Sequence, residues 1–137
     1  MINAPGATIA SLPGAATGGT RDIAVALLDN QGLLRVHPGA AGRLGIIGAF
    51  QNSGTIEMEL GGTTADTQYD RLVISGAATL GGTLNVALIN AFTPVSTNTF
   101  GVVTFGSRSG TFGTANLPAG ITTPPSYNPT NVTLVAP

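Results

Sequence analysis

The stretch Gly54-Thr55-Ile56 recurs at Gly82-Thr83-Leu84 and again at Gly110-Thr111-Phe112, and the spacing is the same both times. Eleven residues before each glycine another apolar run begins, at Arg43, Arg71 and Thr99. A fixed period of this kind indicates structural repeats that stack on one another. We therefore predict repeats at 43–70, 71–98 and 99–126, with N-terminal strands or a cap over 21–42. Residues 127–137 would begin a fourth repeat or form a C-terminal cap.

Alternation of apolar with small or polar residues inside the repeats predicts β-strands. Residues 55–60 and 83–88 alternate at every position, which is the period of a strand buried on one face. The same alternation at Ile23, Val25 and Leu27 favours a strand over a helix for 22–30. Gly-Gly pairs and prolines separate these segments and mark turns. The sequence therefore predicts an all-β protein.

Stacking of the repeats would build one continuous core, because two short strands cannot bury their own apolar face. We predict a short right-handed parallel β-helix, a solenoid in which equivalent side chains form ladders. The expected inward ladders are Leu44, Leu72 and Phe100; Ile46, Ile74 and Val102; and Ile56, Leu84 and Phe112, with Thr55, Thr83 and Thr111 as an outward hydroxyl ladder. An antiparallel β-sandwich, with each repeat folded as a hairpin, is the alternative.

Composition excludes several classes of function. The 137 residues suffice for one domain, and only 8% of them are charged, against about 25% in an average soluble domain. Five arginines, no lysine and a net charge of -1 do not provide the basic surface that a nucleic acid backbone requires. No apolar run approaches the length of a membrane-spanning helix. The absence of cysteine excludes disulfides and thiol chemistry.

The first 20 residues have low charge and many small side chains, which predicts a flexible or docking arm. They contain neither a positively charged start nor a continuous apolar segment, so we expect no secretory signal peptide.

Few residues suggest chemistry. Glu57 and Glu59 share one strand face and could act as a glycosidase acid and base, but solvated face residues are the favoured interpretation. Asp66 and Asp70 flank a loop that could bind calcium, although a third ligand is missing and a solvated corner is favoured. The single histidine, His37, is expected to close a turn. We predict no catalytic, cofactor-binding or metal-ligating residue, and a protein that is not an enzyme.

The C-terminal half is nearly uncharged, since Arg108 is the only charged side chain from Leu72 to Pro137. Surface charge normally keeps sheets and their edges apart, so this half is expected to meet partner subunits or further copies of the chain, for instance in a trimer. The proline-rich residues 117–129 could cover the end of the stack, because proline cannot extend a ladder.

Residues 54–60, 69–76, 78–86 and 110–112 carry a family resemblance. They match a Gly-Thr-Leu strand, an acidic loop, Tyr-Asp-x-Leu-x-Val-x-Gly, and Ala-x-Leu-x-Gly-Thr-Leu-x-Val. With this pattern the chain resembles the β-helical segment near the C-terminal end of autotransporter passenger domains and related bacterial and phage surface repeats. The resemblance implies a parallel β-helix and a place in adhesins, secreted filaments or phage particles. An autotransporter would also need a signal peptide and an outer-membrane barrel, and neither is present in the sequence.

These observations predict a structural protein of a larger assembly, most simply a decoration or tail component of a phage virion, located on the virion or an extracellular surface. A fragment of a secreted bacterial adhesin or surface filament is the alternative. A surface glycan is a candidate ligand, and neither nucleic acid binding nor membrane insertion is expected.

Overall fold

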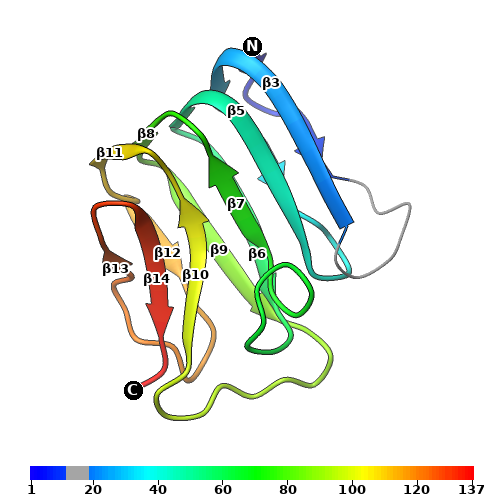
Figure 1. Cartoon of the computed structure of the whole chain (residues 1–137), viewed down its shortest axis with the longest axis vertical. Helices are drawn as coiled ribbons and strands as arrows, with labels where there is room; N and C mark the ends of the chain where they lie inside the picture. The colour runs from blue at the N-terminus through cyan, green and yellow to red at the C-terminus, as the bar shows by residue number, and fades with distance from the viewer. Residues whose placement is uncertain (12–18) are drawn as a thin grey trace.

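The regular structure is entirely β in the computed structural model, which describes residues 1–11 and 19–137 (Figure 1). Within these residues two sheets are formed, one of nine strands and one of five, called here sheet A and sheet B. Neither sheet is accompanied by a helix in the described part of the chain. The strands are β1 (Ile2–Asn3), β2 (Thr8–Ala10), β3 (Gly19–Asn30), β4 (Leu33–Arg35), β5 (Gly42–Asn52), β6 (Thr55–Leu60), β7 (Arg71–Ile74), β8 (Ala77–Leu80), β9 (Thr83–Leu88), β10 (Thr99–Thr104), β11 (Ser107–Gly110), β12 (Thr114–Asn116), β13 (Ser126–Tyr127) and β14 (Asn131–Val135).

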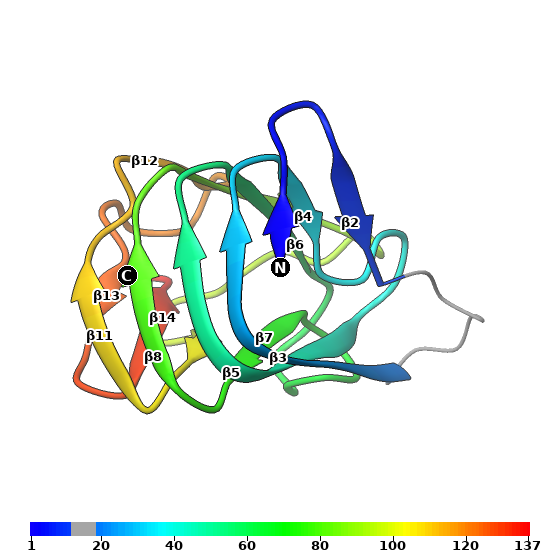
Figure 2. The same cartoon turned by 90° about the horizontal axis from the view of Figure 1, so that it is seen from above.

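The chain alternates between the two sheets and advances by one strand position each time. We call the successive passages units 1 to 5: β1–β2, β3–β4, β5–β6, β7–β9 and β10–β12, of which the last strand of each lies in sheet B and the others in sheet A. Figure 2 shows β3, β5, β8 and β11 side by side in this order. All pairings between successive units are parallel.

The register between units 3 and 4 is the predicted one. Leu44 pairs with Leu72 and Ile46 with Ile74 in sheet A, and Ile56 pairs with Leu84 in sheet B. All six side chains are buried, with exposed fractions of 2% or less. Parallel pairing of equivalent residues contradicts the antiparallel sandwich, because a hairpin in each repeat would require antiparallel neighbours.

Unit 5 has a different register from the one that the sequence predicted. Leu72 pairs with Val103 instead of Phe100, and Leu84 pairs with Ala115 instead of Phe112. The outward partner of Thr83 is Thr114, so Thr111 does not extend the hydroxyl ladder. The predicted positions of Phe100, Val102, Phe112 and Thr111 in their ladders are therefore wrong. In the structure, Gly113-Thr114 occupies the position in unit 5 that Gly82-Thr83 occupies in unit 4.

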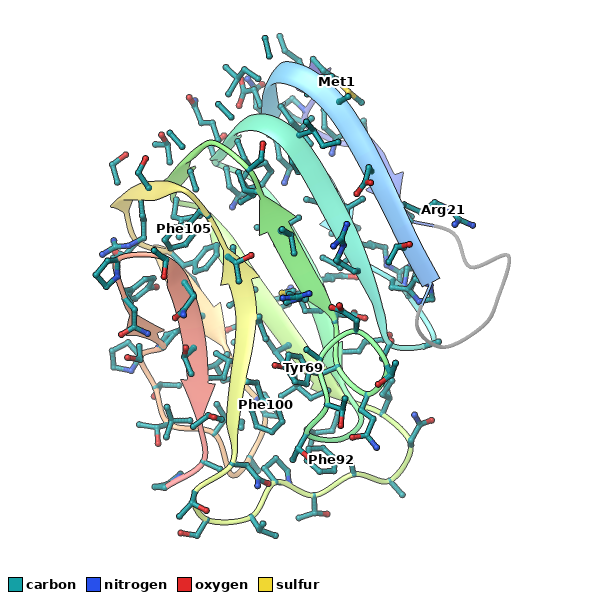
Figure 3. The ribbon with its side chains drawn as sticks, viewed as in Figure 1. Met1, Arg21, Tyr69, Phe92, Phe100 and Phe105 are labelled. Carbon is teal, nitrogen blue, oxygen red and sulfur yellow. The ribbon has the colours of Figure 1, made fainter. Side chains whose placement is uncertain are left out.

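The connection before β10 explains the shift. Leu60 of unit 3 pairs with Leu88 of unit 4 in sheet B, and Leu72 of unit 4 pairs with Val103 of unit 5 in sheet A. The sequence separation of the second pair is three residues longer than that of the first. The extra length lets Phe100 enter the core at another place. Its ring meets Tyr69 edge-on at a centroid distance of 5.4 Å and Phe92 at 6.0 Å (Figure 3). Aromatic contacts thus replace the expected Leu-Leu-Phe ladder at this end of the core.

The N-terminal residues also differ from their prediction. Ile2–Asn3 and Thr8–Ala10 pair with β3 and β4 and form unit 1, whereas the sequence predicted a flexible or docking arm over 1–20. Residues 12–18 of that predicted arm lie outside the described residues.

The strands expected over 21–42 are present as β3 and β4. They pair with unit 3 at a shorter sequence separation than the one between units 3 and 4, for example Ile23 with Ile46 and Leu34 with Ile56. A search for the constant period of the later units therefore does not reveal them.

A buried asparagine ladder connects units 1 to 3. The amide Nδ2 of Asn3 donates to Oδ1 of Asn30 at 2.7 Å, and Nδ2 of Asn30 donates to Oδ1 of Asn52 at 2.7 Å. Asn52 continues the ladder to the carbonyl of Gly81 at 2.8 Å. All three side chains are buried, so their amides depend on one another for hydrogen bonds.

In units 2 to 4 a glycine stands at this corner, namely Gly32, Gly54 and Gly82, because the backbone of the preceding unit leaves no room for a Cβ there. The N–H of Thr83 donates to the carbonyl of Gly54 at 2.9 Å, and the N–H of Gly113 donates to that of Gly82 at 2.9 Å. Gly82 has a positive φ of 61°, and a Cβ at this position would clash with the Gly54 carbonyl.

The C-terminal segment closes sheet A instead of adding a parallel strand. β14 pairs antiparallel with β10, and β13 pairs antiparallel with β14. Arg108 of β11 places its guanidinium carbon 5.2 Å from the ring centroid of Tyr127, whose hydroxyl accepts the N–H of Phe112 at 3.1 Å. Residues 127–137 therefore do not repeat the parallel pattern and act as a cap.

Asn30→Ala tests the asparagine ladder. The substitution removes the middle amide and leaves Oδ1 of Asn52 without its donor in a buried place, so we expect the free energy of unfolding to fall by about 2–3 kcal/mol. Urea unfolding followed by circular dichroism measures it. The control is Asn116→Ala, an exposed asparagine whose loss should change stability by no more than about 0.5 kcal/mol. Equal effects of the two substitutions would contradict a structural ladder.

Candidate functional site

The outward face of sheet B carries a row of polar side chains that crosses four units. Arg35 of β4, Glu57 of β6, Asn85 of β9 and Asn116 of β12 are successive partners in register. The residues before Arg35, Glu57 and Asn85 are Leu34, Ile56 and Leu84, and all three are buried in the core. Because successive side chains of a strand point to opposite faces, Arg35, Glu57 and Asn85 face outward. We call this row together with the outward threonines Thr55, Thr83 and Thr114 the polar face.

Neighbours in the row are bonded in pairs. Nε of Arg35 donates to Oε2 of Glu57 at 2.9 Å, with side chains that are 43% and 38% exposed. Nδ2 of Asn116 donates to Oδ1 of Asn85 at 2.7 Å. The ion pair cancels the only two charges of the row, so the row is neutral as a whole.

Two open cavities lie along the polar face. One of about 510 Å³ extends from the Pro5–Thr8 loop of unit 1 over Gln31 and Thr55 to Glu57 and Asn85. The other, of about 300 Å³, is lined by Arg35, Glu57, Glu59, Asn85 and Asn116 with parts of β6 and β9. Glu57 and Asn85 line both cavities, so the two adjoin, and residues of all five units line one or the other. We call the two cavities together the groove.

The two glutamates that the sequence suggested as an acid and base are bonded to other parts of the chain. Glu57 is paired with Arg35, and the two carboxylate oxygens of Glu59 accept the N–H of Gly39 at 3.1 and 3.0 Å. The structure thus brings them to one face as predicted, but each holds a neighbouring segment.

Asp70 is the most perturbed titratable group. Its carboxylate belongs to a residue that is 1% exposed, and it accepts the N–H of Gly42 at 3.0 Å and that of Glu59 at 2.9 Å. Burial raises the pKa of Asp70 from 3.8 to about 8, although the two N–H donors act in the opposite direction. Asp70 therefore joins the start of β5 to β6 and is too deeply buried to contact a ligand.

The suggested calcium loop is held by an arginine instead. Arg71 forms a bidentate pair with Asp66, at 2.9 Å from Nε and 2.7 Å from Nη2. This pair raises the pKa of Arg71 above its ordinary value. With Asp70 occupied by backbone donors, the two aspartates do not share an empty site, and the described residues contain no cluster of three or more metal-ligating side chains.

His37 is buried and closes a turn, as the sequence predicted. Its Nδ1 lies 3.1 Å from the carbonyl of Ala40, whose own N–H donates to the carbonyl of His37 at 3.4 Å. The imidazole ring of His37 thus contacts the backbone of its own turn.

All six side-chain carboxylates accept a hydrogen bond within the structure, four of them in contacts described above. Of the remaining two, Asp22 pairs with Arg43 at 3.3 Å and Asp29 accepts Nε2 of Gln31 at 2.6 Å. A carboxylate that is to act as acid or base must reach a bound substrate, and these are already oriented toward the chain.

Sequence reasoning did not find Arg35, Asn85 and Asn116 as neighbours. The spacing along the row is not constant, with 22 residues from Arg35 to Glu57 and 31 residues from Asn85 to Asn116. The signal that could have found them is the corner Asn-x-Gly at 30–32 and 52–54, which fixes the register of units 2 and 3 independently of a constant period.

The part of the chain that the structure describes contains no helix that is long and apolar enough to cross a membrane.

Asp70 predicts a particular pH dependence of stability. Because its pKa is higher in the folded state than in the unfolded state, the folded protein binds the extra proton between about pH 4 and 8, and stability falls as the pH rises through this range. We expect the free energy of unfolding to be lower at pH 8.5 than at pH 4.5, and Asp70→Asn to reduce this difference. Asp22→Asn changes the net charge equally at an exposed pair and is the control. Identical pH profiles for the wild type and Asp70→Asn would show that Asp70 is not the titrating group.

No family model matches this sequence, and no curated protein sequence matches it.

Proposed function

We propose that units 1 to 5 form a short right-handed parallel β-helix. The proposal is supported by the parallel pairing of every unit with the next, by the alternation of the chain between sheets A and B, and by the buried asparagines stacked at one corner. Parallel neighbours require a crossover connection, which here is the passage through the opposite sheet.

We further propose that the protein is a non-enzymatic structural component of a larger extracellular assembly, and specifically a decoration or tail component of a phage virion. The observation that carries this proposal is the internal use of all six side-chain carboxylates, together with a fold held by repeated ladders from unit 1 to unit 5. Such a structure offers stiffness and surface instead of reactive groups.

The distribution of charge supports association with other subunits. Arg108 is the only charged side chain after Arg71, and it lies against Tyr127 and donates to the carbonyl of Gly110. Units 4 and 5 therefore present almost no charge that would keep another β-sheet protein away. This surface favours contacts with capsid or tail subunits or with further copies of the chain, as in a trimer.

A fragment of a secreted adhesin or surface filament is the second candidate, favoured by the resemblance of residues 54–112 to bacterial surface repeats. The two candidates differ in their genetic surroundings. Neighbouring capsid or tail genes would favour the virion component, and a reading frame that continues beyond the sequence would favour the adhesin.

Sedimentation of material from the native source tests the assembly role. In a sucrose gradient of lysed cells, we expect the protein to sediment with particles and to remain with them in high salt, because uncharged contacts are not screened by ions. Light scattering of the purified chain, from micromolar to millimolar concentration, provides the control for self-association. A protein that stays monomeric at every concentration and never sediments with particles would contradict the proposal.

A further inference from the structure

We propose that the polar face is a binding site for a neutral, linear oligosaccharide or polysaccharide that lies across the strands, along the direction in which the units stack. This inference does not depend on the assembly role. It rests on the shape of the groove, on the hydrogen-bonding groups that line it and on its balance of charge.

The groove has the shape that an extended chain needs. Its two cavities, of about 510 and 300 Å³, share Glu57 and Asn85 and together touch all five units. Neighbouring strands are about 4.8 Å apart, so four steps between five strands span about 19 Å. A ligand that follows the stack would meet one polar side chain of the row at each step from unit 2 to unit 5, which suits an extended chain.

The lining consists of groups that both donate and accept hydrogen bonds. Nδ2 of Asn116 donates to Oδ1 of Asn85, and within the described residues the opposite halves of both amides, Nδ2 of Asn85 and Oδ1 of Asn116, have no partner. The face also carries the hydroxyls of Thr55 and Thr83 and the amide of Gln31. Sugar hydroxyls are donors and acceptors at once, so mixed amide and hydroxyl surfaces match them.

The charges of the groove favour a neutral ligand. Arg35 and Glu57 neutralise each other at 2.9 Å, and the remaining carboxylate of the lining, Glu59, is held by the N–H of Gly39. A polyanion would find no unpaired cation among the described lining residues. A nucleic acid or a sulfated glycan is therefore disfavoured.

A protein partner is also disfavoured at this face. Protein interfaces rely on apolar or aromatic anchors at their centre. The large apolar side chains that are exposed in the described residues lie elsewhere and line neither cavity: Met1, Ile2, Leu27, Ile47 and Val95. Figure 3 shows Met1 at the N-terminal end of the stack. Because no aromatic ring lines the groove to stack on a sugar, we expect weak binding, with a dissociation constant of about 1 mM.

Titration of the ¹⁵N-labelled full chain with cellohexaose, maltohexaose and xylohexaose, followed by amide chemical shifts, tests the site. We expect at least one of the three to shift the amides of Thr55, Glu57, Asn85 and Asn116, and hyaluronan hexasaccharide to shift none of them. The double variant Asn85→Ala/Asn116→Ala should weaken binding at least tenfold while it keeps the dispersed spectrum of a folded protein.

Thr79→Ala is the matched control, because Thr79 is an exposed polar residue on β8 of sheet A. It should leave the titration unchanged. The proposal is overturned if none of the three neutral hexasaccharides shifts these amides, if the shifts lie outside the polar face, if only the hyaluronan fragment binds, or if the double variant binds as tightly as the wild type.

Discussion

Each unit depends on its neighbours for backbone hydrogen bonds and for the burial of its apolar face. Two or three strands cannot form a core alone, and the ladders Leu44–Leu72 and Ile56–Leu84 exist only because one unit lies on the next. The asparagines strengthen this dependence, since Asn30 has no buried partner other than the groups supplied by units 1 and 3. The stabilising contacts thus lie between units, and a unit at either end of the stack has a neighbour on one side only.

The two ends of the stack differ in how their last strands are covered. At the C-terminal end the antiparallel β14 and β13 occupy the place of a further unit in sheet A, and Arg108 packs on Tyr127. At the N-terminal end β1 and β2 are the last strands of their sheets among the described residues. Open edges of this kind are where sheet proteins meet other chains, which agrees with the proposed role in an assembly.

The all-β class, the strand pattern and the parallel register of units 3 and 4 could be predicted from the sequence, because apolar alternation and the recurrence of Gly54-Thr55 at Gly82-Thr83 can be read directly from it. The register of unit 5 could not, because Gly110-Thr111 imitates the repeat while Gly113-Thr114 occupies it. Unit 1 was missed because its strands are short and lie outside the period.

The candidate site, too, could be predicted from the sequence only in part. His37 was predicted correctly from its type alone, whereas the role of Asp70 needed the positions of Gly42 and Glu59 in space. The polar face depends on unequal spacings between units, so its members could be named only after the register was known.

The stacking of unit 5 on unit 4 is tested most directly by a disulfide, since the chain has no cysteine of its own. Thr83 and Thr114 face outward as partners in adjacent parallel strands, where the separation of their Cα atoms, about 4.8 Å, lies in the range that a disulfide bridges. The account predicts that Thr83→Cys/Thr114→Cys oxidises completely in the folded monomer, as measured by loss of free thiol, and that Thr83→Cys/Thr111→Cys does not. Oxidation of the Thr111 pair in place of the Thr114 pair would contradict it.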